Sequence, residues 1–202
     1  MNSTLAARLV PIQSDIVRSL VLVVAGSLIL AGSAQVTVPF WPVPMTLQTL
    51  AVLLIGGAYG LRLGALTGIL YLFEGAMGLP FFAGGKSGIF DSHLDYLFVS
   101  PSMGYVVGFI LAAGAVGYLA QAGWINSLVR MTVAALIGSF LIYVPGVLWL
   151  GYWFVATKGM ATGDAANAAI HAGFLPFLLG DAIKSLIAGF SLSASWTGSK
   201  QA

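Results

Sequence analysis

Residues 174–189 read FLPFLLGDAIKSLIAG, an apolar segment of helical length that carries Asp181 and Lys184. Side chains three residues apart lie on one face of a helix, so these two can form an ion pair. A charge inside a lipid bilayer costs about 2.5 kcal/mol or more, which makes a charged pair there a candidate functional site. The alternative is a structural ion pair that joins two helices, although buried ion pairs stabilise proteins poorly.

The composition of the whole chain is that of an integral membrane protein. Its 202 residues have a mean hydropathy of +0.98, and only 7% of them are charged, whereas soluble domains carry about 25% charged residues. We therefore expect a single membrane domain over residues 1–202. The absence of cysteine excludes disulfides and thiolate metal sites. The basic residues are dispersed and the net charge is +2, so nothing predicts nucleic-acid binding.

The apolar segments predict an all-α membrane protein, a bundle of six transmembrane helices. The expected spans are 16–34, 46–59, 62–79, 102–121, 125–150 and 173–193. A tight turn at Gly60–Leu61 separates the second span from the third, and Pro145–Gly146 interrupts the fifth. The first span could instead be a cleavable signal peptide, since Arg18 precedes it and small residues follow it. We favour an uncleaved span, because its removal would leave an odd number of segments.

Three long odd-numbered loops, 34–45, 80–101 and 151–172, fall on one side of this predicted bundle. The first, AQVTVPFWPVPM, contains three prolines and cannot continue a helix, so we expect it to fold back against the bundle. The other side holds both termini and most of the basic residues, namely Arg8, Arg18, Arg62, Arg130 and Lys200. The positive-inside rule then places both termini in the cytoplasm of a multi-pass protein in the bacterial cytoplasmic membrane, with the long loops outside.

The polar groups within the predicted spans gather in the outer half of the membrane. At 1.5 Å per residue, Asp181 lies about 10 Å and Lys184 about 15 Å below the outer edge. Gln48 is similarly shallow, and Glu74 lies about one and a half turns from the outer end of its span. This distribution predicts a pocket that opens outward beneath the odd loops. It does not match a continuous proton pathway, which would need carriers in the inner half as well.

Two further patterns each have a structural and a functional interpretation. Small residues recur at helix-packing intervals, in the sets Ser27/Ala31, Gly64/Gly68 and Gly104/Gly108/Ala112. They favour either close packing inside the bundle or a docking face for another membrane subunit. Aromatic residues near the outer boundary, Trp41, Trp149, Tyr152 and Trp153, form either an interfacial belt or part of the pocket lining.

The motifs typical of enzymes and nucleotide sites are missing. Gly85-Lys86-Ser87 matches the end of a phosphate-binding loop, but Pro80 stands where the first glycine would fall. Asp91, His93 and Asp95 alternate and could bind a metal, but we favour a solvated loop or a partner contact, because no second cluster of ligands lies nearby in the sequence. Neither a nucleophile elbow nor an H-E-x-x-H pattern occurs, so we expect no enzyme activity and no cofactor.

Several of these stretches resemble the BioY family, the biotin-specific substrate-binding components of energy-coupling factor (ECF) vitamin transporters. They are AQVTVPFWPVPMTLQTLAVLLIG (34–56), YLFEGAMGLPFFAGG (71–85), SPSMGYVVGF (100–109), YVPGVLWL (143–150) and PFLLGDAIKSLIAG (176–189). The resemblance covers most of residues 16–192. The chain departs from the family's G-P-T-G-G-Y-L-x-G-F pattern at Ser100, Ser102 and Met103.

The resemblance implies high-affinity capture of biotin from outside the cell. Asp181 would accept ureido N–H bonds, and Lys184 would donate to the ureido oxygen or to the tail carboxylate. Other implied contacts are polar ones from Gln48, Thr46 and Tyr105, apolar walls from Phe40, Trp41 and Trp149, and Lys86 as the loop cation nearest the carboxylate. The family acts with a transmembrane coupling (T) protein and two cytosolic ATP-binding subunits, whose ATP hydrolysis would rock the whole bundle.

Other functions remain open on the sequence alone. The chain could bind a different vitamin within the same transporter class. It could also be a solitary secondary carrier in which Asp181 and Glu74 carry protons. A membrane enzyme would need Glu74 and His93 as acid and base, but these belong to different elements and form no motif.

Overall fold

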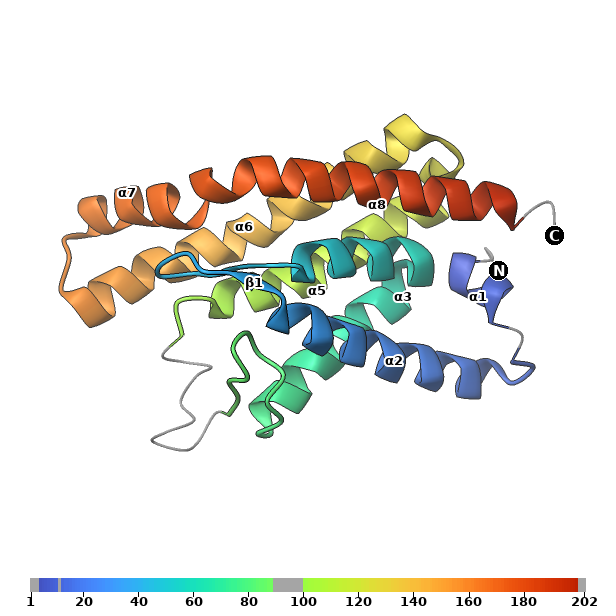
Figure 1. Cartoon of the computed structure of the whole chain (residues 1–202), viewed down its shortest axis with the longest axis horizontal. Helices are drawn as coiled ribbons and strands as arrows, with labels where there is room; N and C mark the ends of the chain where they lie inside the picture. Colours follow the sequence, from blue (N-terminus) through green and yellow to red (C-terminus); the bar gives the residue numbers. More distant parts are fainter. Residues whose placement is uncertain (1–3, 11, 89–99, 200–202) are drawn as a thin grey trace.

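The structure, a computed structural model, describes residues 4–10, 12–88 and 100–199 and is mostly helical (Figure 1). The loop residues Asp91, His93 and Asp95 lie outside this described part, so their role stays a prediction. The helices are α1 (Leu5–Leu9), α2 (Asp15–Gln35), α3 (Gln48–Ala76), α5 (Met103–Gln121), α6 (Leu128–Lys158), α7 (Thr162–Gly173) and α8 (Leu178–Gly198), with 3-10 turns η1 (Trp124–Asn126) and η2 (Leu175–Phe177).

The helices have the length and hydropathy of membrane-spanning segments. In the described part of the chain, five helical stretches are long and apolar enough to cross a bilayer. They are α2, α3, α5, α6 and the nearly continuous stretch Thr162–Gly198, which joins α7, η2 and α8. The expected class, a helical membrane protein, is therefore confirmed.

Helix α3 consists of two limbs, 48–59 and 61–76, that fold back on one another at Gly60. Gly60 has φ 83° and ψ 178°, a backbone conformation that side chains other than glycine rarely adopt. A Cβ atom on Gly64 would lie 3.1 Å from Cα of Gly56, whereas eight residues of unbroken helix span about 12 Å. Figure 1 shows the same reversal in α3. The predicted turn at Gly60–Leu61 is thus confirmed.

Helix α6 runs without interruption from Leu128 to Lys158, so the predicted break at Pro145–Gly146 is wrong. Proline removes one backbone hydrogen bond from a helix, but membrane helices tolerate this loss where a neighbour covers the site. Here α5 supplies that cover, since a Cβ on Gly104 would lie 2.2 Å from the Pro145 carbonyl oxygen. The two helices are in close backbone contact at the proline.

The predicted long loop 151–172 is also wrong. Helix α6 continues through the first part of it, and α7 occupies Thr162–Gly173. The segment contains many polar residues, but it forms an alanine-rich helix. Ala165 and Ala169 of this helix are buried one turn apart against α6. At 1.5 Å per residue the 31-residue α6 is about 46 Å long, which exceeds the ~30 Å thickness of a hydrocarbon layer.

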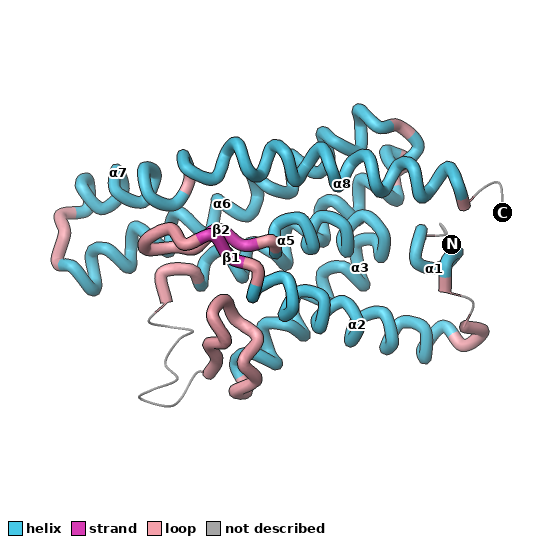
Figure 2. Tube along the Cα trace, viewed as in Figure 1, coloured by secondary structure: helices cyan, strands magenta, loops and turns pink. Residues whose placement is uncertain are grey.

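The proline-rich segment forms a short β-hairpin rather than an irregular loop (Figure 2). Strand β1 (Thr37–Val38) pairs antiparallel with β2 (Met45–Thr46), with Thr37 opposite Thr46. Val43, in the connecting turn, is buried in the core. The segment therefore folds back on the bundle as predicted, but the fold is not purely helical.

The predicted small-residue sets pack inside the bundle. Ser27 and Ala112 are completely buried. A Cβ on Gly108 would lie 2.6 Å from the carbonyl oxygen of Ile142 in α6. A Cβ on Gly68 would lie 3.0 Å from the Ile110 side chain of α5. Of the two interpretations given above, internal packing is the one that the structure supports.

The two terminal elements meet at the end of the bundle opposite the β-hairpin (Figure 1). The guanidinium of Arg8 in α1 lies 3.9 Å from the ring centroid of Trp196 near the end of α8. The Trp196 indole also donates to Asn126 Oδ1 at 2.8 Å. The first and last helices therefore lie at one end, as the predicted topology requires.

We predict that Gly60→Ala lowers the stability of the protein, because the methyl group would occupy a glycine-only conformation that costs about 1–3 kcal/mol. It would also lie 2.8 Å from the Gln121 side chain. The measurement is the apparent melting temperature of the detergent-purified protein. Gly32→Ala in α2 is the matched control, since a Cβ there meets nothing within 4 Å. Equal melting temperatures for the two variants would contradict the strained turn.

Candidate ligand-binding site

A cavity lies where the β-hairpin, α3, α5, α6 and α8 converge. Together with its opening to solvent, it encloses about 600 Å³ of space that is not filled by atoms. Its walls are largely apolar and include Val43, Phe82, Val106, Phe109, Ile142 and Phe177. Thr46, Gln48, Ser102, Tyr105, Tyr143, Asp181 and Lys184 supply its polar groups. A few polar groups in an apolar cavity are typical of sites that orient a small ligand.

Asp181 and Lys184 form the predicted ion pair at this cavity. Lys184 Nζ donates to Asp181 Oδ1 at 3.0 Å, and the two side chains are only 12% and 10% exposed. Asp181 belongs to the first turn of α8, where the positive end of the helix dipole favours a carboxylate. The pair as a whole is neutral, and both of its members face the cavity.

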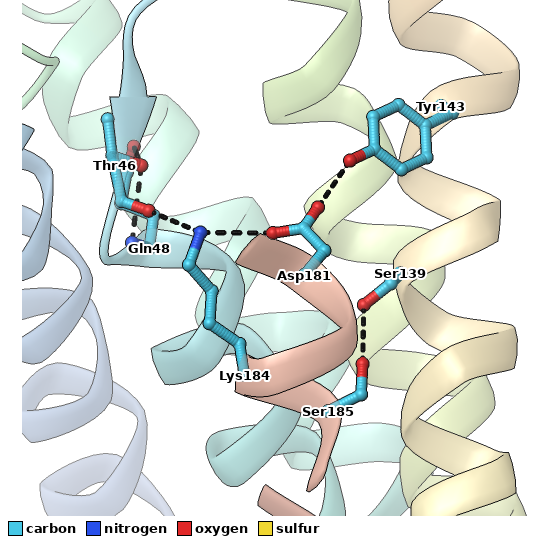
Figure 3. Close-up of polar contacts among 7 residues, drawn as sticks. All are labelled: Thr46, Gln48, Ser139, Tyr143, Asp181, Lys184 and Ser185. Carbon is cyan, nitrogen blue, oxygen red and sulfur yellow. Dashed lines mark hydrogen bonds and ion pairs between the residues drawn. The ribbon is translucent and has the colours of Figure 1, made fainter. Parts of the chain in front are cut away.

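Two other elements complete the surroundings of this pair (Figure 3). Lys184 Nζ also donates to the backbone carbonyl of Thr46 in β2 at 2.9 Å. On the other side, the Tyr143 hydroxyl of α6 donates to Asp181 Oδ2. A carboxylate has about four acceptor positions, so Asp181 can accept further hydrogen bonds from a ligand.

A second hydrogen-bond network fixes Gln48 at the start of α3. Its Nε2 donates to the Tyr71 hydroxyl at 2.8 Å and to the Leu30 carbonyl at 3.4 Å. The Thr46 hydroxyl lies 3.3 Å from Gln48 Oε1. Gln48 is 4% exposed and lines the cavity, so the structure brings it together with Thr46, Asp181 and Lys184 as predicted.

Tyr105 lies in the cavity wall, again as predicted. Its hydroxyl donates to the Gly173 carbonyl at the end of α7, at 2.8 Å. Its ring meets that of Tyr143 edge-on, at 6.3 Å between centroids. Tyr105 therefore holds α5 against α6 and α7 while its ring contributes to the cavity surface.

Tyr143 and Tyr71 are site residues that sequence reasoning missed. Both lie within predicted membrane spans, and both rings line the cavity. Their hydroxyl groups could have identified them as candidate site residues, because a tyrosine hydroxyl inside a membrane needs a hydrogen-bond partner. Tyr143 finds that partner in Asp181, whereas Tyr71 bonds to Gln48 and to the Phe81 carbonyl.

Three predicted contact residues lie away from the cavity. Trp41 is 70% exposed and packs on Phe154 at 6.3 Å between ring centroids. Trp149 donates its indole N–H to the Ser100 carbonyl at 2.8 Å and lines a shallow groove between α5 and α6 instead. The Lys86 side chain is exposed, although Phe82 and Ala83 of the same turn do reach the cavity. None of the three is among the residues that line this cavity, and their contacts with a ligand stay predictions.

Phe40 and Glu74 also differ from expectation. Phe40 stands behind the cavity, because its ring packs on Phe177, which does line the wall, at 5.8 Å. Glu74 is not among the cavity residues. Its Oε2 atom is buried without a hydrogen-bond partner in the described part of the chain. Glu74 therefore stands apart from the polar groups that line the cavity, and its role stays open.

Comparison with known proteins identifies the family of this chain. The sequence model of the BioY family matches residues 2–201. The biotin transporter BioY of Thermotoga maritima is 35% identical over 162 residues, which cover 80% of this chain and 85% of that protein. The biotin transporter BioY2 of Lactococcus lactis is 32% identical over 173 residues, with 84% and 85% coverage. These relatives are named as transporters, which agrees with the expectation that the chain is not an enzyme.

The fold also matches a solved structure, the crystal structure of the S-component for biotin from an ECF-type ABC transporter. The two superpose with a TM-score of 0.70 over 92% of this chain and 94% of the other. Their sequences are 20% identical. The match therefore shows the fold alone.

We predict that Lys184→Met destabilises the protein by about 3–5 kcal/mol, because it leaves the buried Asp181 carboxylate without a cation. Adding Asp181→Leu should restore most of that loss. The measurement is the apparent melting temperature in detergent. Arg18→Met is the matched control, since Arg18 and Asp15 form a pair with the same spacing but 21% and 65% exposed side chains; its cost should stay below about 1 kcal/mol. Equal effects of the two single substitutions would show that burial of the inner pair is unimportant.

Proposed function

This chain belongs to the BioY family, and we propose that it is the biotin-binding membrane component of a biotin uptake transporter. The observation that carries this proposal is the buried Asp181–Lys184 pair in the wall of an apolar cavity. An ion pair inside a membrane needs a reason to persist beyond stability. Because relatives of this chain are named as biotin transporters, we infer that the ligand is biotin.

The ureido ring of biotin matches the polar end of the cavity. It presents two N–H donors and one strong carbonyl acceptor, in a group that carries no net charge. Asp181 would accept N–H bonds at the positions left free by Lys184 and Tyr143. Lys184 would donate to a ligand oxygen, either of the ureido group or of the tail carboxylate.

The rest of the ligand would occupy the apolar part of the same cavity. Phe82, Phe109 and Phe177 offer aromatic surface to the thiophane ring and the aliphatic tail. Gln48, Thr46 and Tyr105 would hold the polar rim in place through the network described above.

We propose that the chain crosses the bilayer six times. The two limbs of α3 would be separate spans on either side of Gly60, with α2, α5, α6 and α8 as the others. Arg8, Arg18, Arg62 and Arg130 belong to the end that carries the termini, and the positive-inside rule assigns that end to the cytoplasm of a bacterial cell membrane. The cavity, at the β-hairpin end, then opens to the outside.

Energy for import would come from other subunits. The chain has no nucleotide-binding motif, and the solved structure with the same fold is the S-component for biotin from an ECF-type ABC transporter. We therefore infer that a transmembrane coupling (T) protein and two cytosolic ATP-binding subunits act with it. ATP hydrolysis would reorient the whole bundle so that the bound ligand reaches the cytoplasmic side.

The described geometry gives less support to a solitary proton-coupled carrier. Such a carrier would use Asp181 and Glu74 as proton sites, but Asp181 is paired with a lysine and Glu74 lies outside the cavity. Uptake by this chain alone that stops with an uncoupler and ignores ATP depletion would favour the carrier. A different vitamin in the same transporter class is distinguished by its ligand, since purified protein would then fail to bind biotin at micromolar concentration.

We predict that Asp181→Asn weakens biotin binding by about tenfold or more, because the neutral amide replaces a charge-assisted acceptor. The measurement is equilibrium binding of radiolabelled biotin to purified protein. Asp15→Asn is the matched control, since the Asp15 side chain is 65% exposed at the start of α2; its affinity should equal that of the wild type. Unchanged affinity of a correctly folded Asp181→Asn variant would remove Asp181 from the site.

A further inference from the structure

Two serines form a buried hydrogen bond between α6 and α8, close to the ion pair but outside the cavity (Figure 3). Ser139 Oγ of α6 lies 3.1 Å from Ser185 Oγ of α8, and the two residues are 4% and 0% exposed. Neither serine is among the residues that line the cavity. This bond can therefore influence a ligand in the cavity only through other residues.

The direction of this bond distinguishes the two serines from three other buried hydroxyl residues of the bundle. Hydroxyl groups within helices often bond to a backbone carbonyl of the preceding turn. Ser27, Ser33 and Thr67 bond in this way to carbonyls of their own helices. Ser139 and Ser185 bond to each other across the helix interface instead. A bond between two helices restricts how they rotate and slide on one another, whereas a bond within one helix does not.

The serine pair lies one turn from the contact between Tyr143 and Asp181 on both helices. Ser185 follows Asp181 by four residues, and Ser139 precedes Tyr143 by four, so the two contacts lie on the same pair of helix faces. A serine hydroxyl stands one bond beyond Cβ, so the Ser139–Ser185 bond fixes the two backbones closely. The long Tyr143 side chain can follow a displaced carboxylate. The serines therefore restrict the register of α8 more tightly than the tyrosine does.

The rest of this interface provides close contact but few features that define a register. A Cβ atom on Gly189 would lie 2.8 Å from the backbone nitrogen of Thr132 in α6, and Ala188 is completely buried. Small apolar surfaces of this kind can slide on one another. In coiled coils a single polar contact within an apolar interface specifies the register of the helices. The serine pair is placed to do the same here.

We propose that the hydrogen bond between Ser139 and Ser185 sets the register of α8 on α6 and thereby positions the Asp181 carboxylate for the ligand. The inference rests on the proposed function, in which Asp181 accepts hydrogen bonds from biotin. Both serines are positioning residues, since they act through Asp181. A binding group must be held within about 0.5 Å and 10–20° of its productive geometry. A small shift of α8 would therefore weaken binding even when the fold is intact.

The test measures equilibrium binding of radiolabelled biotin and the apparent melting temperature of the same purified variants. We expect Ser185→Ala to weaken biotin binding about fivefold, which is the size of a typical interhelical hydrogen bond in a membrane. Its melting temperature should also fall, because the buried Ser139 hydroxyl loses its partner. Ser139→Ala removes the same bond from the other helix and should have the same effects, so it decides the question if Ser185→Ala does not fold.

The double variant Ser139→Ala/Ser185→Ala separates positioning from stability. It leaves no hydroxyl unpaired, so we expect its melting temperature to recover most of the loss. Biotin affinity should stay about fivefold below that of the wild type, because the contact that defines the register is still missing. Affinity that recovers together with the melting temperature would overturn the proposal and leave the bond a purely structural one.

A second measurement asks whether the effect passes through Asp181. In an Asp181→Asn background, Ser185→Ala should change biotin affinity less than twofold, because the charge-assisted acceptor that it positions is already absent. The same fivefold loss in both backgrounds would contradict the proposal. Ser27→Ala is the matched control, since Ser27 is as fully buried as Ser185 but bonds within α2, to the Val24 carbonyl at 2.9 Å; its biotin affinity should equal that of the wild type.

The same experiments distinguish this inference from the proposed function. If the wild type fails to bind biotin at micromolar concentration, the proposed function itself is wrong. If the wild type binds biotin and both Ser185→Ala and Ser139→Ala bind it equally well, the proposed function stands and the positioning role of the serine pair is refuted.

Discussion

The hydrogen bond from Lys184 to Asp181 is the interaction on which the architecture of the site depends. Lys184 also holds the Thr46 carbonyl of the β-hairpin, and Asp181 also accepts from Tyr143 of α6. One ion pair on α8 thus connects three separate parts of the chain. Because both charges are buried, neither can lose its partner without a large cost. The hairpin, α6 and α8 are therefore held in a fixed relation around the cavity.

The rest of the bundle provides the dry, close-packed frame that makes this pair effective. Gly56 and Gly64 bring the limbs of α3 together, and Gly104 and Gly108 bring α5 onto α6. Such close backbone contact stabilises membrane helices by dispersion and excludes water. In that setting the electrostatic attraction of a polar ligand to the pair is stronger than it would be at a surface. The small residues provide the close packing, and in the proposed function the charged pair provides the recognition of the ligand.

Much of this could be predicted from the sequence, because membrane helices obey strong local rules. The spacing of Asp181 and Lys184 gave their contact, and Gly60 gave the reversal in α3. The predictions that differ from the structure concern features that depend on tertiary packing. Pro145 was expected to break α6, but α5 covers it. Trp41 and Trp149 were assigned to the cavity by residue type, yet aromatic residues suit both a pocket and a membrane interface. The role of Tyr143 depends on which helix faces Asp181, and sequence spacing does not reveal this.

A structure of the protein with biotin bound would show directly whether the buried ion pair holds the ligand. We expect an Asp181 carboxylate oxygen within about 2.7–3.2 Å of a ureido nitrogen, with Lys184 still in contact with Asp181. Biotin bound elsewhere on the bundle, while Asp181 and Lys184 keep only their present partners, Tyr143 and Thr46, would rule out this role of the pair. The ion pair would then be a joint between helices, and the cavity beside it would need another explanation.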